Sequence, residues 1–327
     1  MKVSVILTVL NEGEGLATLL DALLTQSLPA DEFVIVDGGS RDDTLAILQE
    51  RARRDARLRV HVEPGVNIAQ GRNIAIAHAC GDVIAVTDGG CRPERDWLRE
   101  LLAPMTHDAA VGAVAGRFVP APASRFEHYC GRMSMPDMDN DSQRGMFYGR
   151  SSAFRRALWT RVGGYPEWLY TGEDTLFAIA VGHVPGWRVA YAPASVVHWR
   201  PRPSLFKMAK MFYLYGRGNG RIQHGSLRGS LYWLRCHAAV VISLVAGLAW
   251  PWAWLLGAAL SWPLWQGIAA PNLAAMAGEP RDRLLYVPVI ALVRNAATNL
   301  GFLRGWLEHR RGAEFQQRLE RYLGRGG

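Results

Sequence analysis

The feature that most limits how this chain can fold is a run of about forty residues, Ala238–Gly278, without any Asp, Glu, Lys, Arg or His. One membrane-spanning helix needs about 20 apolar residues, so the run is long enough for two. A core helix of a soluble protein is the alternative, but such a core seldom needs so long an uncharged sequence. We therefore expect this part of the chain to enter a membrane.

A second apolar segment, Leu284–Leu303, contains Arg294, Asn295 and Asn299. An Arg at the centre of a membrane span costs at least about 2.5 kcal/mol on insertion scales. We therefore expect two spans within Ala238–Gly278, with Leu284–Leu303 lying at the membrane interface. In a competing arrangement, Leu284–Leu303 is the second span and part of the uncharged run is re-entrant.

The first 200 residues or so have a different organisation. Short apolar runs alternate with helical patterns, and the predicted strands are Val3–Val9, Phe33–Val36, Leu58–Val62 and Val83–Thr87. This alternation predicts an α/β domain with a mostly parallel sheet covered on both faces. Residues 116–150 interrupt the pattern with several Pro and Gly, which predicts a long functional loop. Helical patterning resumes near Ser151–Val162.

Composition narrows the class of protein. The chain has 327 residues, enough for roughly two domains, and a net charge of +8. An excess of positive charge suits nucleic acid, a membrane surface or an anionic substrate. No basic and aromatic recognition motif is present, which argues against nucleic acid. The four Cys are scattered, which argues against a structural zinc site and favours a reducing compartment.

Acidic residues follow several of the predicted strands. Glu12, Asp37 and Asp88 each come just after a strand, and the pair Glu173-Asp174 opens a helix. In open α/β sheets, ligands bind outside the carboxyl ends of the strands, so these acids are expected to point into one cleft. The sequence has neither a GxGxxG motif nor a P-loop, so a nucleotide must be held in some other way.

An ordered set of motifs in this half resembles the family 2 glycosyltransferases, which have the GT-A fold. The resemblance covers about the first 200 residues, and it rests on the segments 5–12, 34–44, 71–73, 81–91, 162–165 and 172–175. The hydrophobic second half is similar to that of bacterial members that build surface polysaccharides or glycolipids.

The resemblance implies roles for the residues at the donor side. Asn11, Glu12 and Asp37 would contact the nucleobase and ribose of a nucleotide-sugar donor, and Arg72 would face its diphosphate. Asp88 falls where the family's DxD motif begins, and that motif holds Mg²⁺ or Mn²⁺ against the diphosphate.

It also implies roles at the acceptor side. Asp174 aligns with the catalytic base, which removes a proton from the acceptor hydroxyl. Glu173 would be its neighbour, in contact with the acceptor or raising the pKa of the base by like charge. His198 would meet the metal or the donor phosphate; a structural histidine is the alternative.

Two departures from the family pattern affect these expectations. Gly90 stands where the second acid of the DxD motif belongs, which leaves one carboxylate for the metal. No QxxRW motif follows the base, which argues against a processive synthase. Instead, Arg217 and Arg221 lie in a glycine-rich segment, 215–221, that is expected to close on a diphosphate or lipid phosphate. A basic turn beside the membrane is the other interpretation of this segment.

Together these features predict an inverting glycosyltransferase that transfers a sugar from a nucleotide-diphosphate sugar to a hydroxyl of a lipid-linked or polysaccharide acceptor. It would be anchored in the cytoplasmic membrane with its catalytic domain facing the cytoplasm, because no signal peptide is apparent and the C-terminal tail is rich in Arg. The alternatives are a polyprenyl-phosphate glycosyltransferase and a non-catalytic subunit of an assembly complex. The predicted parts are a catalytic domain at 1–203, an amphipathic linker at 204–235, membrane helices at 236–307 and a basic tail at 308–327.

Overall fold

The computed structural model describes residues 1–13, 15–135 and 145–324. The chain forms two compact units: unit 1 is Met1–Pro120, Met135–Arg200 and Gln317–Gly327, and unit 2 is Ala121–Ser134 and Pro201–Gln316. The four predicted parts of the chain, with their separate roles, stay a prediction.

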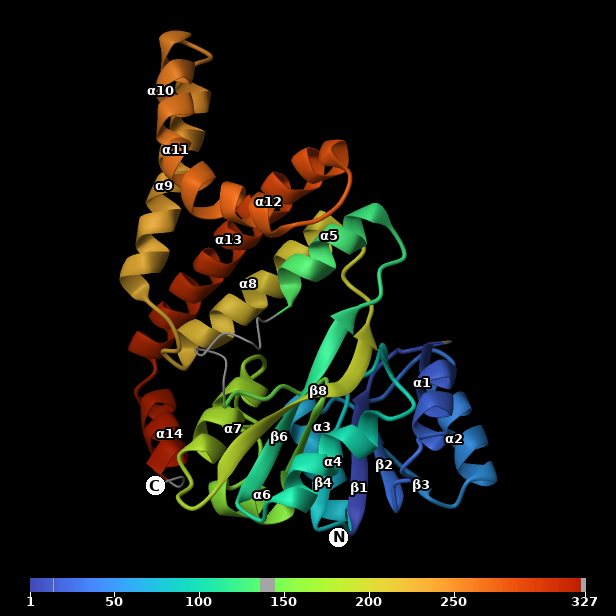
Figure 1. Cartoon of the computed structure of the whole chain (residues 1–327). Coiled ribbons are helices and arrows are strands. Elements are labelled where there is room, and N and C mark those ends of the chain that lie inside the picture. The colour runs from blue at the N-terminus through green and yellow to red at the C-terminus, as the bar shows by residue number, and fades with distance from the viewer. Residues whose placement is uncertain (14, 136–144, 325–327) are drawn as a thin grey trace. The chain divides into compact units, whose positions relative to one another are not determined.

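Unit 1 is built on a mixed sheet of eight strands in the order β3-β2-β1-β4-β7-β6-β8-β5 (Figure 1). β1 pairs in parallel with β2 and β4, β2 with β3, and β6 with β8, while the pairings of β7 with β4 and β6, and of β5 with β8, are antiparallel. The strands are β1 (Val3–Val9), β2 (Glu32–Asp37), β3 (Leu58–Val62), β4 (Val83–Val86), β5 (Cys91–Pro93), β6 (Val111–Pro120), β7 (Ser152–Arg155) and β8 (Arg188–Trp199).

Helices cover this sheet. α3 packs against β1 and β2, and α4 packs against β6 and β8 (Figure 1). β1, β2 and β4 are buried along nearly their whole length, as their continuous apolar sequences predict for strands covered on both faces. The helices of unit 1 are α1 (Gly15–Leu24), α2 (Thr44–Arg54), α3 (Ile68–His78), α4 (Trp97–His107), α6 (Arg156–Val162) and α7 (Glu173–Gly182). The predicted α/β class is confirmed.

The carboxyl ends of β1, β2 and β4 lie at one edge of the sheet. The parallel register places Val9 beside Asp37 and Ile6 beside Val86. The segments that follow these three strands therefore leave the sheet together, and they carry the acids that follow the strands in the sequence.

The prediction of a helical segment at Ser151–Val162 was partly wrong. This segment begins with β7 and turns helical only at Arg156, where α6 starts. β7 has four residues, and its side chains Ala153 and Phe154 are buried between β4 and β6. So short a run cannot be told from the start of a helix by periodicity.

The prediction of a long irregular loop at 116–150 also needs correction. The segment contains the end of β6 and a helix, α5 (Arg125–Ser134), which belongs to unit 2. Tyr129 and Met133 lie four residues apart on α5 and are buried in unit 2, so a helical face was hidden between the prolines. Residues 136–144 lie outside the described part of the chain.

The described residues of unit 2 form helices and turns. A buried core joins α5, α8 and α13 with residues 264–276. Besides α5, its elements are α8 (Leu205–Arg221), α9 (Leu227–Ala246), α10 (Trp252–Leu260), α11 (Trp262–Leu264), the π-helix η2 (Trp265–Ala269), α12 (Ala270–Ala275) and α13 (Pro280–Arg311). α14 (Ala313–Gly324) begins in unit 2 and ends in unit 1.

The uncharged run Ala238–Gly278 does not form the two long helices that two spans within it would require. It contains the end of α9 and then four short elements, α10, α11, the π-helix η2 and α12. Ser261 separates α10 from α11. Among the described residues, the two helices long and apolar enough to cross a membrane are α9 and α13. By length and composition, the structure therefore favours the competing arrangement, in which the segment around Leu284–Leu303 is the second candidate span.

The polar residues of α13 have protein partners within unit 2. Arg294 Nη1 donates to the carbonyl oxygen of Met133, and its guanidinium lies 5.9 Å from the centroid of the Phe212 ring. His237 on α9 is 3.2 Å from Asn295 Oδ1. These contacts reduce the cost of placing polar groups in an apolar helix.

The glycine-rich segment 215–221 is neither a flexible loop nor a turn, because it forms the last part of α8. α8 runs along α13 (Figure 1), and the two backbones touch at glycines. A Cβ on Gly216 or Gly220 would overlap a carbonyl oxygen of α13, and one on Gly301 or Gly305 would overlap a carbonyl oxygen of α8. This is the small-xxx-small pattern that lets two helices approach closely.

Candidate active site

Arg72 binds two of the other predicted site residues in unit 1. It comes from α3, its side chain is 2% exposed, and its two terminal nitrogens bind different carboxylates. Nη2 is 2.7 Å from Asp88 Oδ1, and Nη1 is 3.0 Å from Glu173 Oε1. Arg72 thus joins the segment after β4 to the first turn of α7, and the structure brings Asp88 and Glu173 together around one guanidinium.

The charge of Arg72 is held in place by its neighbours. Burial disfavours the charged guanidinium, but the carboxylates of Asp88 and Glu173 outweigh this effect and raise the pKa of Arg72. The guanidinium also lies 5.3 Å from the centroid of the Tyr165 ring. Because its two terminal nitrogens bind carboxylates from different segments and the side chain is buried, Arg72 braces the site in this structure; its contact with a diphosphate stays a prediction.

Glu173 and Asp174 are neighbours in sequence but differ in environment. Glu173 is buried, and burial together with the charge of Asp174 raises its pKa to about 7, against the opposing effect of Arg72. Asp174 is only partly buried, and its Oδ1 accepts a hydrogen bond from its neighbour Thr175 N at 2.7 Å. Of the two residues, Asp174 is therefore the more exposed, and its contact with an acceptor stays a prediction.

Gly149 is a site residue that the sequence did not single out. Its amide N is 3.4 Å from Asp174 Oδ2, and a Cβ at this position would overlap Arg72 Nη2. Tyr148 lies next to it, and burial followed by the charge of Asp174 raises the pKa of this tyrosine to about 12. The only sequence signal here was the glycine itself, which brings the chain close to a buried guanidinium.

The predicted nucleobase and ribose residues are linked to each other. Asp37 is fully buried at the end of β2, and its carboxylate accepts hydrogen bonds from Ser40 N and Ser40 Oγ. Ser40 Oγ in turn accepts from Asn11 N at 2.9 Å, and Asn11 Oδ1 accepts from Arg41 N at 2.9 Å. Asn11 and Asp37 therefore shape one turn at the sheet edge, and their contacts with a donor stay a prediction.

Glu12 lies against the segment that carries Asp88. A Cβ on Gly89 would overlap Glu12 Oε1, and one on Gly90 would lie 3.8 Å from Glu12 Oε2. The half-buried carboxylate of Glu12 thus packs on the backbone directly after Asp88.

His198 has a partner other than a metal in this structure. It lies near the end of β8 and pairs across the strands with Arg92 of β5. Its Nε2 is 2.9 Å from Glu94 Oε1. The predicted metal role of His198 would require Nδ1, or the opening of this contact at Nε2.

The donor set at Asp88 fits a divalent ion that also binds a donor diphosphate. Among the residues that the structure describes, no three His, Cys, Asp or Glu side chains are grouped to hold a metal ion. Asp88 binds Arg72 through Oδ1, and its side chain is 29% exposed. Mg²⁺ usually takes one or two protein carboxylates and completes its shell with phosphate oxygens and water, which suits this arrangement.

Arg217 and Arg221 belong to unit 2, and there both contact Glu308. Arg217 Nε is 3.0 Å and Arg221 Nε is 3.9 Å from Glu308 Oε2. The guanidinium of Arg221 also lies 4.4 Å from the centroid of the Phe315 ring. The structure thus gives these two residues a role in packing α8 against the last turns of α13, and their binding of a phosphate stays a prediction.

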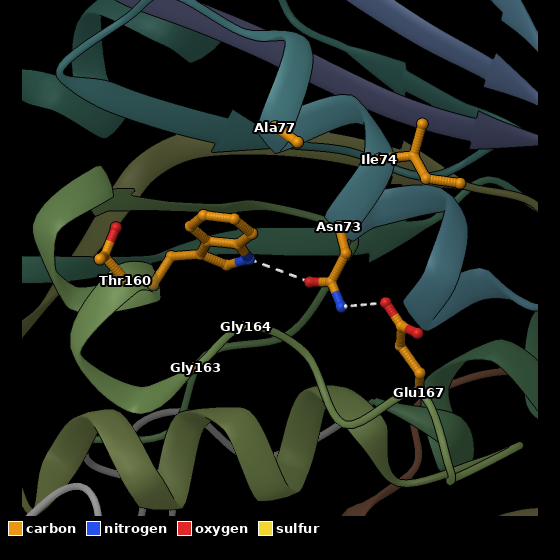
Figure 2. A pocket seen from close by; sticks show the side chains of 8 residues that line it. Asn73, Ile74, Ala77, Thr160, Gly163, Gly164 and Glu167 are labelled. Carbon is orange, nitrogen blue, oxygen red and sulfur yellow. Dashed lines mark hydrogen bonds between the residues drawn. The ribbon is translucent and has the colours of Figure 1, made fainter.

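Unit 1 also has an open cavity of about 510 Å³ between α3 and α6 (Figure 2). Asn73 lies at its wall and bonds to both sides: Oδ1 accepts from Trp159 Nε1 and Tyr165 N, while Nδ2 donates to Glu167 Oε1 and the carbonyl of Tyr165. Because all of its hydrogen-bonding atoms are used, Asn73 holds the 159–167 segment, and with it the Tyr165 ring that faces Arg72. No predicted site residue lines the cavity, which is lined by Asn73, Ile74, Ala77, Trp159, Thr160, Gly163, Gly164 and Glu167.

Comparisons with known proteins agree with this architecture. Residues 4–166 match the family described as Glycosyl transferase family 2. The chain is 27% identical over 178 residues to "Glycosyltransferase AglE" of Haloferax volcanii, a match that covers 53% of this chain and 58% of AglE, less than two thirds of its length. It is 24% identical over 326 residues to "Succinoglycan biosynthesis protein ExoA" of Rhizobium meliloti, covering 94% of this chain and 96% of ExoA.

A solved structure supports the fold. The mannosyltransferase PcManGT from Pyrobaculum calidifontis, in complex with GDP-Man and Mn²⁺, superimposes with a TM-score of 0.57 at 22% identity, covering 91% of this chain and 87% of PcManGT. The sheet order, the carboxylates after β4 and at the start of α7, and the family match over residues 4–166 lead to one assignment. The chain belongs to glycosyltransferase family 2 and has the GT-A fold of that family.

Proposed function

We propose that this protein transfers a sugar from a nucleotide-diphosphate sugar to a hydroxyl of a lipid-linked or polysaccharide acceptor, with inversion at the anomeric carbon. The observation that supports this most is the chain of contacts from Asp88 through Arg72 to Glu173, next to the partly exposed Asp174. Asp88, which we propose for the donor side, and Glu173, the neighbour of the proposed base Asp174, both bind the buried Arg72, and this supports the proposal.

In the proposed mechanism, Asp174 removes the proton from the acceptor hydroxyl as that oxygen attacks the anomeric carbon. The bond between the anomeric carbon and the diphosphate breaks as the new glycosidic bond forms, and no covalent enzyme intermediate is needed. The Gly149 amide and Thr175 hold the Asp174 carboxylate in place. A positioned base of this kind contributes typically 10²–10⁴-fold to the rate.

Asp88 is the residue that we propose binds a divalent ion, Mg²⁺ or Mn²⁺, together with the donor diphosphate. Such an ion, when bound, supplies positive charge that offsets the charge on the departing diphosphate. The structure of PcManGT contains Mn²⁺ and GDP-Man, which supports a nucleotide-sugar and metal site in this fold.

The acceptor class is proposed from the second half of the chain and from the relatives. ExoA is named for succinoglycan biosynthesis, and α9 and α13 are long and apolar enough to cross a membrane. An acceptor at the membrane therefore suits this chain. We propose that both helices span the cytoplasmic membrane and that unit 1 faces the cytoplasm, where nucleotide sugars are made.

A screen of nucleotide sugars tests this proposal and needs no acceptor. Thermal unfolding and donor hydrolysis are measured for UDP-, GDP- and dTDP-sugars with Mn²⁺, with Mg²⁺ and with EDTA. We expect one donor class to raise the melting temperature and to be slowly hydrolysed, both in a metal-dependent way. If no nucleotide sugar binds under any of these conditions, the non-catalytic assembly subunit becomes the better account.

A further inference from the structure

The contact between Glu12 and the glycines after Asp88 has a consequence for metal binding. Gly90 stands where the family pattern has its second acid, and Glu12 packs on the same two-residue stretch of backbone. The Glu12 carboxylate can lie against Gly89 because this residue has no side chain; a Cβ there would overlap Glu12 Oε1. At Gly90, Oε2 would lie 3.8 Å from a Cβ, at ordinary contact distance.

The turn that carries Glu12 is held by its backbone conformation and by two hydrogen bonds to Thr44. Asn11 and Gly13 both have a left-handed conformation, with φ of 55° and 53°. The amides of Glu12 and Gly13 donate to Thr44 Oγ1 at 2.9 and 3.0 Å, and Thr44 is fully buried. The turn after β1 is thus anchored to the start of α2, with the Glu12 side chain lying on Gly89.

We propose that Glu12 supplies the second carboxylate to the divalent ion held at Asp88, in place of the acid that is absent at Gly90. This inference rests on the proposed nucleotide-sugar function. Hard divalent ions prefer oxygen ligands, and Glu12 brings a carboxylate to the segment that carries Asp88 from a different strand end. This metal-binding role of Glu12 differs from the nucleobase contact that the family resemblance implied.

Binding experiments on the full-length protein separate the two roles without any turnover. Mn²⁺ binding is followed by the electron paramagnetic resonance signal of free Mn²⁺, with and without UDP or GDP, whichever the wild type binds. Nucleotide binding is measured by calorimetry in EDTA and again with Mn²⁺. The variants are Glu12→Gln, which keeps the size of the side chain, and Gly89→Ala, whose Cβ displaces the Glu12 carboxylate without a left-handed φ to strain it.

Two further variants complete the series. Gly182→Ala is the matched glycine control, because nothing lies within 4 Å of a Cβ at this position. The double variant Glu12→Gln/Gly90→Asp returns a carboxylate to the family position. Gly90 has a φ of 69°, which Asp tolerates better than most residues.

We expect Glu12→Gln and Gly89→Ala to weaken Mn²⁺ binding in the nucleotide complex by about tenfold or more, the range typical for lost partners at metal sites. Nucleotide affinity in EDTA should stay at the wild-type value, Gly182→Ala should behave as the wild type, and the double variant should regain part of the Mn²⁺ affinity. An equal loss of nucleotide affinity in EDTA, with unchanged Mn²⁺ binding, would overturn the proposal and restore the nucleobase contact. Unchanged binding of both would also overturn it. If the wild type itself binds neither nucleotide nor Mn²⁺, the proposed function fails first, and that result is distinct from the other two.

Discussion

Arg72 supports the candidate site through two carboxylates that come from distant parts of the chain. Its partners lie 16 and 101 residues away in sequence, and the pair with Glu173 is buried on both sides, with exposures of 2% and 8%. A buried guanidinium of this kind ties two elements together, and removing it leaves a buried carboxylate without its partner. The brace is thus a structural requirement as well as a feature of the site.

Replacing Arg72 with Met should therefore destabilise the protein. Breaking a buried ion pair by removing one partner typically costs about 3–5 kcal/mol. We expect the free energy of unfolding, measured by urea denaturation, to fall by about that amount. Arg53→Met is the control, because the Arg53 side chain is 71% exposed and should change stability by less than about 0.5 kcal/mol. Equal effects of the two substitutions would show that Arg72 is not a structural brace.

The raised pKa of Glu173 predicts how the free energy of unfolding depends on pH. Its pKa is raised from an ordinary value of 4.5 to about 7, so between these values the folded protein holds a proton that the unfolded chain has lost. The contribution of Glu173 to stability is therefore largest below about pH 4.5 and decreases as pH rises to about 7. Glu173→Gln removes this titration, so its melting temperature should depend less on pH than that of the wild type across this window. Parallel curves for the two proteins would contradict the assignment.

At the scale of elements, local patterns predicted the four strands β1 to β4, because each is a short apolar run in the sequence. They failed where the deciding contacts are not local. β7 is too short to show a period, and 215–221 was not predicted to be helical because glycines disfavour isolated helices. Those glycines are accommodated because the backbone of α13, more than 70 residues later, lies directly against them. The contact of Gly149 with Arg72 was hidden for the same reason.

The packing of α8 on α13 is testable with a single methyl group. A Cβ on Gly301 would overlap the Tyr213 carbonyl, whereas nothing lies within 4 Å of a Cβ on Gly324. We expect Gly301→Ala to lower the stability of the purified protein in detergent by about 1–3 kcal/mol, the usual cost of overpacking, and Gly324→Ala to leave it nearly unchanged. Equal melting temperatures for the two variants would mean that the helices are not held as closely as the structure has them.

At the scale of the whole molecule, the chain combines a GT-A unit with a helical unit that has two candidate membrane helices, α9 and α13. The sequence predicted that a membrane region exists from its lack of charge, but it did not place the helix ends. These depend on the breaks near Ala246 and Ser261 and on the partners of Arg294, none of which is visible in hydropathy alone.

The orientation of these helices can be measured by cysteine labelling in intact cells. If α9 and α13 are the two spans, residues between them lie outside the cytoplasm and the Arg-rich tail lies inside. In a variant with Cys80 replaced by Ser, Glu279→Cys should react with a membrane-impermeant maleimide added outside, and Gln317→Cys should react only after the cells are opened. Protection of Glu279→Cys would support two spans within Ala238–Gly278 instead. Labelling of Gln317→Cys from outside would refute both arrangements.

The central claim is that Asp174 acts as the base in transfer from a nucleotide sugar to a hydroxyl, and Asp174→Asn tests it most directly. The measurement compares the rate of sugar transfer to the acceptor with the affinity for the donor, for wild type and variant under the same metal conditions. The account predicts a loss of transfer of about 10²–10⁴-fold while donor affinity stays within about twofold of the wild type. A variant that keeps nearly full transfer would contradict the account, and it would favour a phosphate acceptor, which needs no base.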